Sequence, residues 1–148
     1  ILCDEVTSAL DVSVQAAVLD LLDVLKRQDG TTYIFVSHDL AVVKAISDRV
    51  AVLYQGRICE IGPVAAVYSV PFHPYTDALL GAVLEPDPDV APRLTADDAV
   101  ELSPPKTGCP FQRRCPRKLG TICETDIPTA QEIAPGHIIH CHIPNVDL

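Results

Sequence analysis

Two acidic residues follow a short apolar run at the start of the chain, and a histidine follows the next such run. Asp4 and Glu5 come after residues 1–3, and His38 comes after residues 31–36, which are all β-branched or aromatic. Runs of this kind are typical of strands buried on both faces of a parallel sheet. The carboxyl ends of such strands are where α/β folds bind their ligands. The sequence therefore predicts an α/β fold with Asp4, Glu5 and His38 at one edge of the sheet.

The segments after these two strands have the pattern of helices. Residues 12–28 carry apolar side chains at helical spacing, with Asp11 as a candidate N-cap and Gly30 just beyond the last turn. We expect this helix to pack one face on the sheet. Asp39 is placed to cap a second helix that starts directly after His38. Strand–helix–strand–helix order is the signature of an α/β domain.

The next segments are shorter. Residues 49–54 and 57–61 predict a hairpin at the edge of a mainly parallel sheet. Pro63 and Pro74 suit first helical turns, and they predict short helices at 63–69 and 74–83.

Prolines and acidic residues then dominate residues 85–107, which predicts an extended connector. We expect it to separate the C-terminal part of an α/β domain (1–84) from a tail (108–148). The tail is rich in Cys, Pro, Arg and His and too short for an ordinary hydrophobic core, so we expect a metal to order it.

Composition limits the class of protein. The net charge of −9 argues against nucleic-acid binding, because no basic face is available to neutralise phosphates. No apolar stretch reaches the roughly 18 residues of a spanning helix, and no signal peptide opens the chain, which predicts a cytoplasmic protein without a membrane span. Because the chain starts at Ile1, inside the first strand, we expect a fragment of a longer protein.

The acidic pair suits phosphoryl transfer. Successive side chains of a strand point to opposite sides, so Asp4 and Glu5 have different tasks. Asp4 suits a Mg²⁺ partner, and Glu5 suits a general base that positions water at a terminal phosphate. The alternative is a solvated strand end without chemistry. No Gly is followed by Lys, so the G-x-x-x-x-G-K-[ST] loop that cradles phosphates is missing.

Together these motifs resemble the ABC-type ATPases over residues 1–62. Asp4-Glu5 is similar to the end of the Walker B strand, residues 8–11 to the D-loop, and residues 37–39 to the switch-histidine loop. The resemblance implies ATP and Mg²⁺ as ligands, with Asp4 serving Mg²⁺, Glu5 polarising the attacking water and His38 contacting the terminal phosphate. Within the D-loop, Ser8 would lie at the nucleotide and Asp11 would couple two sites across a dimer.

Two departures from that family bear on activity. Val6 stands where the family usually has Pro, which affects the geometry of the loop beside the site. The phosphate loop and the Leu-Ser-Gly-Gly-Gln signature are absent, so we expect this chain alone neither to bind nor to hydrolyse ATP.

Residues 71–76 (Pro-Phe-His-Pro-Tyr-Thr) resemble the His-Pro-Tyr segment of ATPase subunits of oligopeptide and dipeptide importers. From the residues alone, the segment is a helix opened by proline, with Tyr75, Leu79 and Val83 on one face for packing. His73 is assigned no chemistry.

Four of the six cysteines lie in the last quarter, at Cys109, Cys115, Cys123 and Cys141. Their spacing, C-x5-C-x7-C-x17-C, lacks the C-x2-C pairs of common zinc sites. Disulfides, plain packing, and a zinc site that uses some of His137, His140 and His142 all remain open on the residues alone.

The segment also resembles the cysteine-rich tail of the same importer subunits, which implies a [4Fe–4S] cluster on the four cysteines. Five basic residues with no acid between them bracket the first two ligands and could balance the negative charge of a cluster, or could form a solvated face: Lys106, Arg113, Arg114, Arg117 and Lys118. Cys3 and Cys59 are expected to be packing residues.

The sequence is therefore interpreted as a C-terminal part of the ATPase subunit of an ABC importer for short peptides. The implied partners are a second ATPase subunit, in a homo- or heterodimer, and transmembrane permease subunits at the inner face of the cell membrane. The alternatives are a metal-binding or redox-responsive module without ATPase activity, and a related subunit that serves nickel or another small solute.

Overall fold

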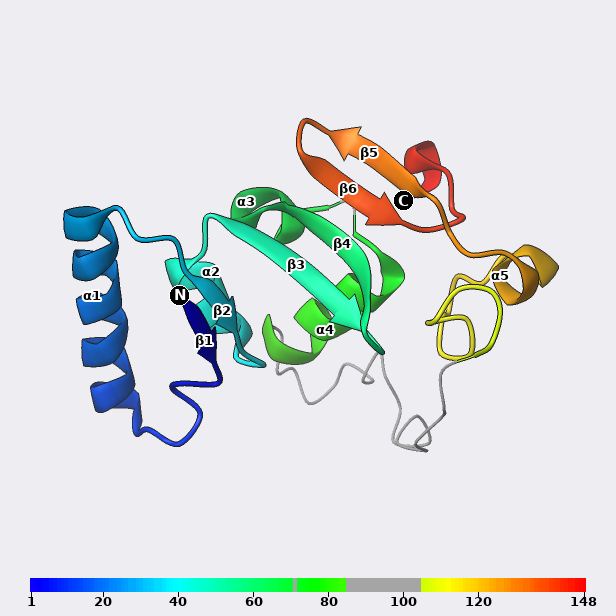
Figure 1. Ribbon diagram of the computed structural model, residues 1–148. Helices are drawn as coiled ribbons and strands as arrows, with labels where there is room; N and C mark the ends of the chain where they lie inside the picture. Colours follow the sequence, from blue (N-terminus) through cyan, green and yellow to red (C-terminus); the bar gives the residue numbers. More distant parts are fainter. Residues whose placement is uncertain (71, 85–104) are drawn as a thin grey trace. The chain divides into compact units, whose positions relative to one another are not determined.

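The computed structural model of the protein describes residues 1–70, 72–84 and 105–148 (Figure 1). They form two compact units, Ile1–Asp48 and Arg49–Leu148. Most of the predicted connector, residues 85–104, lies outside the described residues. No helix in the described ranges is both long and apolar enough to cross a membrane.

The first unit has the predicted strand–helix–strand–helix order. It consists of β1 (Leu2–Asp4), α1 (Val12–Asp29), β2 (Ile34–Val36) and α2 (Leu40–Ile46). β1 and β2 pair in parallel, with Leu2 opposite Ile34 and Asp4 opposite Val36. Both strands therefore end at the same edge, as the sequence predicts.

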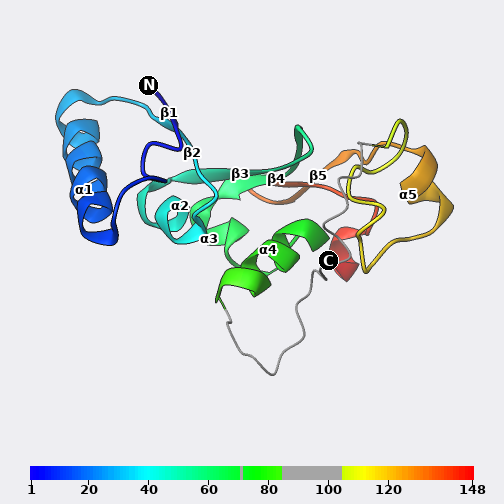
Figure 2. The ribbon, with the colours of Figure 1, turned by 90° about the horizontal axis from the view of Figure 1, so that it is seen from below.

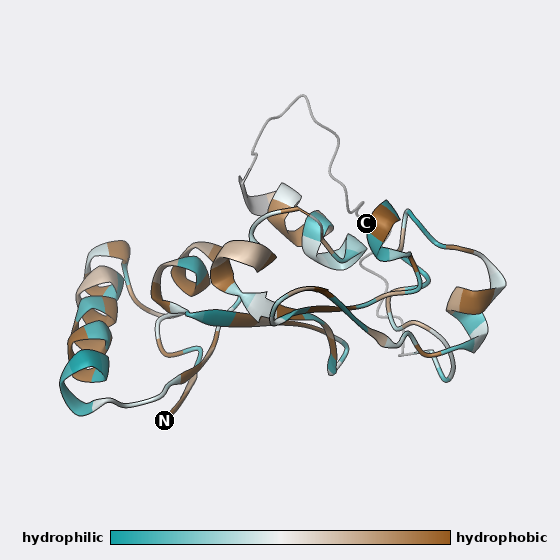
Figure 3. Ribbon diagram, turned by 90° about the horizontal axis from the view of Figure 1, so that it is seen from above, coloured by the Kyte–Doolittle hydropathy of each residue, from teal (hydrophilic) through white to brown (hydrophobic). Residues whose placement is uncertain are grey.

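The caps of α1 are those that the sequence predicts, but its packing is not. The Asp11 carboxylate accepts the backbone N–H groups of Ser13 and Val14, and Gly30 ends the helix in the left-handed conformation at φ 64°. No residue of α1 is buried. Figure 3 shows apolar and polar residues interspersed along it. The expectation that one face packs on a sheet is therefore wrong for the described residues.

The hairpin predicted at residues 49–54 and 57–61 is confirmed. It belongs to a four-stranded antiparallel sheet, however, and not to the mainly parallel sheet that we expected. Its strands lie in the order β3 (Arg49–Tyr54), β4 (Arg57–Pro63), β6 (His137–His140) and β5 (Ala130–Ala134). Tight turns join β3 to β4 and β5 to β6, and a strand that turns directly back on its neighbour can pair only antiparallel. Parallel pairing is confined, among the described strands, to β1 and β2.

Helices α3 (Val64–Val67) and α4 (Pro74–Leu84) lie on the same face of this sheet (Figure 2). Pro63 ends β4 and caps α3 instead of lying inside the helix, which is shorter than the predicted 63–69. Pro74 does open α4, as predicted.

The tail shares a core with β3 and α4, in addition to a small cluster of its own formed by Ile139, Cys141 and Ile143. It contains α5 (Thr121–Thr125), β5, β6 and a 3-10 helix (Asn145–Asp147). Phe111 is fully buried, and its ring lies 5.2 Å from Tyr54 of β3 and 5.3 Å from Tyr75 of α4, between ring centroids. The predicted packing role of Tyr75 is therefore confirmed, and its partners come from β3 and from the tail.

Candidate functional site

The carboxyl ends of β1 and β2 bring Glu5 and His38 together. Glu5 Oε1 lies 2.9 Å from His38 Nδ1, although the two residues are 33 positions apart. Both side chains are open to solvent, with 53% of Glu5 and 74% of His38 exposed. A carboxylate and an imidazole in this arrangement can exchange or hold a proton at a molecule bound above the sheet edge.

The backbone holds Glu5 in an unusual conformation. Its φ is 46°, in the left-handed region that a residue with a side chain seldom adopts and that costs roughly 1–2 kcal/mol. The Glu5 N–H donates to the carbonyl of Val36 at 2.9 Å, which extends the β1–β2 pairing by one residue. The Glu5 carbonyl in turn accepts the N–H and the hydroxyl of Ser8, at 3.1 and 2.9 Å. Strain of this kind is concentrated at functional sites.

The other predicted residues of this site are positioned by the same loops. Asp4 is the last residue of β1 and is exposed beside Glu5. Asp11 is engaged as the cap of α1, and its hydrogen bonds from Ser13 and then Val14 lower the pKa of its carboxyl below the usual range. Asp39 caps α2 directly after His38, by accepting the N–H groups of Ala41 and Val42. The loop that carries His38 therefore runs from the end of β2 to the capped start of α2.

The four predicted cysteine ligands of the tail gather in the second unit, where we call them the four-thiol group. Cys109, Cys123 and Cys141 are buried, and Cys115 is half-buried. All are free thiols, so no disulfide joins any of the chain's described cysteines.

Burial is the main cause of a raised pKa for three members of the four-thiol group, and it raises the pKa of Cys109 to about 11. Neighbouring thiols of the group raise these pKa values further: Cys109 responds to Cys141, Cys115 and Cys123, and Cys141 responds to Cys123. Burial and the neighbouring thiols therefore favour the neutral thiol over the thiolate at Cys109, Cys115 and Cys141.

Local backbone contacts place the first ligand against the third. The Cys109 N–H donates to the Cys123 carbonyl at 2.8 Å. Gly108, at φ 78°, makes the approach possible, because a Cβ there would lie 2.3 Å from the Cys123 carbonyl oxygen. Gln131 holds the fourth ligand by donating to the Cys141 carbonyl at 2.5 Å.

The structure does not support a single zinc ion on this group. No three or more His, Cys, Asp or Glu side chains in the described part of the chain are arranged so that they could hold one metal ion. His137 lies 2.7 Å from Glu60, and His142 lies 2.8 Å from the carbonyl of Asp126, so two of the three candidate histidines are engaged elsewhere. The zinc alternative therefore loses two of its three candidate histidines, and His140 remains.

The basic residues around the first two cysteines have separate tasks. Arg117 donates to the carbonyls of Leu148, at 3.2 Å, and Asp147, and its charge lowers the pKa of Cys115 and Cys141 against the effect of burial. Lys118 instead pairs with Glu124 at 2.5 Å. Charge balance at the thiols therefore involves Arg117, while Lys118 belongs to the surface.

A buried polar cluster that we did not predict joins three elements of the second unit. Glu60 of β4 is fully buried; its Oε1 lies 2.7 Å from His137 Nε2 of β6, and its Oε2 accepts the N–H of His73 at 2.9 Å. Nδ1 of His73 accepts the N–H of Tyr75, so His73 caps α4. Gly62 lets the His137 ring approach, since a Cβ there would lie 2.8 Å from it. The sequence signal that could have revealed this cluster is Glu60 itself, an acidic residue inside an apolar strand. A carboxylate buried in such a strand requires a buried partner.

Comparison with known proteins finds relatives along nearly the whole chain. Residues 59–123 match the family described as "Oligopeptide/dipeptide transporter, C-terminal region". A Brucella ovis protein named as a peptide import ATP-binding protein is 46% identical over 99% of this chain. The chain is therefore similar over nearly its whole length to proteins named as peptide import ATP-binding proteins. A Bacillus subtilis relative, named as an oligopeptide transport ATP-binding protein, is 43% identical over 97% of the chain. The chain spans about half the length of these relatives, 46% and 44% respectively.

Proposed function

We propose that this chain belongs to the ATP-hydrolysing subunit of an importer for dipeptides or oligopeptides. The observation that carries the proposal is the 2.9 Å contact of Glu5 with His38 at the carboxyl ends of two parallel strands. The printed names of the relatives, which describe peptide import and ATP binding, support the substrate and the ligand.

Within that site, each predicted residue has a task that its position permits. Glu5 would accept a proton from the attacking water and orient it, and His38 would hold the terminal phosphate while keeping Glu5 in place. Asp4 would hold Mg²⁺, which neutralises phosphate charge when it is bound. Ser8 fixes the loop that carries Glu5, and Asp11 would couple two such sites across a dimer.

The test is Glu5→Gln in a full-length protein that carries this sequence. Turnover of ATP should fall by ~10²-fold or more while nucleotide binding persists, because the amide cannot accept the proton. Glu124→Gln, an exposed position paired with Lys118, is the matched control and should leave turnover unchanged. Equal turnover in the Glu5→Gln protein would remove Glu5 from the mechanism.

The partners follow from the same proposal. A second ATPase subunit would complete the site, and transmembrane permease subunits would recruit the pair to the inner face of the cell membrane. Membrane vesicles can be prepared with the assembled transporter oriented so that this subunit faces the interior. Such vesicles should accumulate a labelled dipeptide only when their interior contains ATP. Uptake of nickel in place of the peptide would favour the alternative substrate, and uptake of neither would leave the metal-binding module as the better proposal.

We also propose that the four-thiol group holds a [4Fe–4S] cluster, chiefly as a structural staple for the tail. Donor chemistry supports it: three of the cysteines are buried, Cys115 is half-buried, and all four are free thiols. Each ligand of such a cluster binds its own iron, so the four thiols would surround a larger body than one ion. The positive charge of Arg117 beside Cys115 and Cys141 would offset the charge of the bound thiolates.

Anaerobic reconstitution with ferrous iron and sulfide tests the cluster. The protein should take up about four iron and four sulfide, with a broad visible absorption that bleaches in air. Cys115→Ser or Cys123→Ser should lose the cluster and expose the tail to protease, whereas Cys3→Ser should change neither. Zinc at one per chain without sulfide, in anaerobically purified protein, would refute the iron–sulfur assignment.

A further inference from the structure

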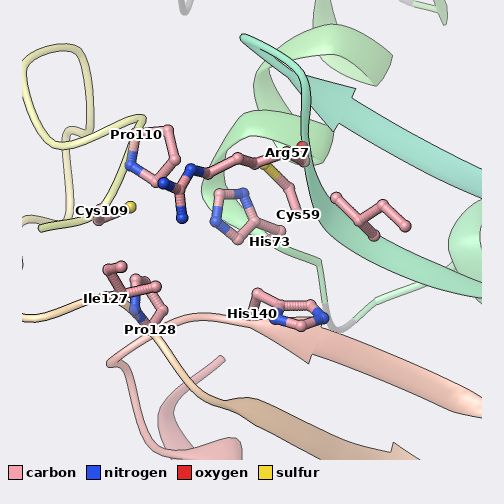
Figure 4. Close-up of a pocket in the computed structure, with 9 residues that line it drawn as sticks. Arg57, Cys59, His73, Cys109, Pro110, Ile127, Pro128 and His140 are labelled. Atoms are coloured by element: carbon pink, nitrogen blue, oxygen red, sulfur yellow. The ribbon is translucent and has the colours of Figure 1, made fainter. Parts of the chain in front are cut away.

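A pocket with a volume of about 290 Å³ lies between β4 and the tail in the second unit (Figure 4). Its walls come from β4, from the residue before α4, from the segments on either side of α5 and from the end of β6. This volume is at the lower limit of the roughly 300–1,000 Å³ that sites for small molecules have. The pocket therefore suits a ligand at the small end of that class.

Most of the pocket wall is apolar. Ile58 and Ile127 line it, although they are 42% and 57% exposed to solvent. Pro110 and Pro128 add apolar surface with little freedom to move. A ligand that covers these side chains would remove exposed apolar surface from water, so the walls favour a ligand with an apolar group.

Arg57 gives this apolar pocket a positive charge. Figure 4 shows its side chain reaching from β4 toward the loop that carries Cys109 and Pro110. The guanidinium makes no hydrogen bond or ion pair with a described residue. No acidic residue is among the described residues that line the pocket. A free guanidinium beside apolar walls is suited to an anion, and its planar fork matches a carboxylate.

The two histidines of the pocket have different roles. His73 is 1% exposed; its Nδ1 accepts the N–H of Tyr75, and the ring also forms a hydrogen bond with the backbone of His140. Both ring nitrogens of His73 are therefore engaged, and the ring is a wall of the pocket. The His140 ring is half-buried and makes no side-chain hydrogen bond within the described part of the chain. It can donate a hydrogen bond to the same anion as Arg57.

We propose that this pocket binds the C-terminal end of a short peptide whose last side chain is apolar. The carboxylate would accept hydrogen bonds from Arg57 and His140. The side chain would lie against Ile58 and Ile127. A free amino acid fits less well, because its ammonium would lie near the Arg57 guanidinium with no acid in the pocket wall to balance it. In a peptide, the same nitrogen belongs to a neutral amide.

The inference goes beyond the proposed transport activity and does not depend on it. Neither Arg57 nor His140 belongs to the proposed ATP site or to the proposed ligands of the cluster. The pocket lies within the second unit, and its peptide would bind there whether or not ATP is hydrolysed elsewhere.

NMR titration of the isotope-labelled chain tests the inference, with N-acetyl-leucine as the probe. This molecule contains the carboxylate, the apolar side chain and the neutral amide. It should shift the amide signals of Ile58, Ile127 and His140 with a Kd on the order of 1 mM, as expected of so small a ligand. N-acetyl-leucinamide, which lacks the carboxylate, should bind at least about tenfold more weakly. Free leucine should also bind more weakly than N-acetyl-leucine.

Variants of the chain identify the groups that recognise the probe. Arg57→Gln should weaken the binding of N-acetyl-leucine by roughly tenfold, because a charge-assisted hydrogen bond is lost. Arg57→Lys should have an intermediate effect, since an ammonium keeps the charge without the planar fork. Ile127→Ser should weaken binding by removing apolar contact. Arg27→Gln, which removes an exposed guanidinium from α1, is the matched control and should bind as the wild-type chain does.

The remaining outcomes would overturn the inference. The absence of a saturable shift with N-acetyl-leucine would show that the pocket does not bind a peptide end. Equal binding of N-acetyl-leucinamide would remove the carboxylate from recognition, and equal binding of acetate would remove the side chain. Tighter binding of leucine than of N-acetyl-leucine would assign the pocket to free amino acids. Failure of peptide uptake by the assembled transporter would refute the proposed function alone, because this binding is measured on the chain itself.

Discussion

The two units of the chain contain the same pair of side chains in opposite surroundings. In the first unit, Glu5 lies 2.9 Å from His38, and both are more than half exposed. In the second unit, Glu60 lies 2.7 Å from His137, and 0% and 3% of these side chains are exposed. An exposed pair can meet a molecule from solvent, whereas a fully buried pair contributes to the fold, because breaking it leaves an unpaired buried group. The chemistry of a carboxylate–imidazole pair therefore does not reveal its task, but its burial does.

Removal of the two carboxylates should separate the two tasks most sharply. Glu60→Ala leaves the buried His137 ring and the N–H of His73 without a partner, so the second unit should lose roughly 3–5 kcal/mol of stability. Glu5→Ala should change the free energy of unfolding by at most about 0.5 kcal/mol. Hydrogen exchange, read separately over β4 and β6 and over β1 and β2, measures both. Similar losses in the two units would show that burial does not distinguish the pairs.

A glycine of the tail gives the next effect. Gly108→Ala combines left-handed strain with a clash against the Cys123 carbonyl, and we expect a loss of about 3 kcal/mol in the second unit. Gly136→Ala is the matched control, because its φ is 71° and its nearest new contact is an ordinary 3.7 Å. The control should cost only the strain, about 1–2 kcal/mol. Chemical denaturation compares them, and equal losses would refute the close approach of the two cysteine segments.

The buried histidine of the second unit predicts a response to pH. Burial, and after it the charge of the nearby His140, lowers the pKa of His73 from 6.5 to about 4. The unfolded chain therefore binds a proton as the pH falls through 6.5, while the folded chain binds it only near 4. Stability is complete above pH 6.5 and is lost progressively down to about pH 4, by about 3 kcal/mol in total.

Urea unfolding of the second unit between pH 7.5 and pH 4 measures this slope. His73→Asn is the control, since Asn can still cap α4 but does not titrate. A slope unchanged in the His73→Asn protein would mean that another group is responsible.

The sequence predicts the first unit better than the second, for a physical reason. Asp11, Gly30 and Asp39 act through neighbours within a few residues, so their caps could be predicted from local spacing alone. The contact of Glu5 with His38 required only the rule that parallel strands end at one edge.

In the second unit, the decisive contacts are distant in sequence. Glu60 and His137 are 77 positions apart and meet because β6 pairs with β4, and Cys59 packs in one buried cluster with Cys109, 50 positions along the chain. No local pattern specifies the pairing of β4 with β6, so the four-stranded sheet and the buried cluster of Glu60, His137 and His73 could not be predicted, although the hairpin of β3 and β4 could. The cysteine spacing predicted the group of four cysteines, but it did not predict which other residues pack against that group.

The smallest expected effect concerns Asp11, which combines a local task with a proposed distant one. Asp11→Ala removes the cap, so the amides of Ser13 and Val14 should exchange faster and α1 should fray at its first turn. Asp11→Asn keeps an oxygen that can accept the same N–H groups and should protect them almost fully. In a full-length dimer, Asp11→Asn should nevertheless lower ATP turnover if the charge of Asp11 couples the two sites. Turnover that falls only in the Asp11→Ala protein would assign Asp11 to the capping of α1 and remove it from the dimer contact.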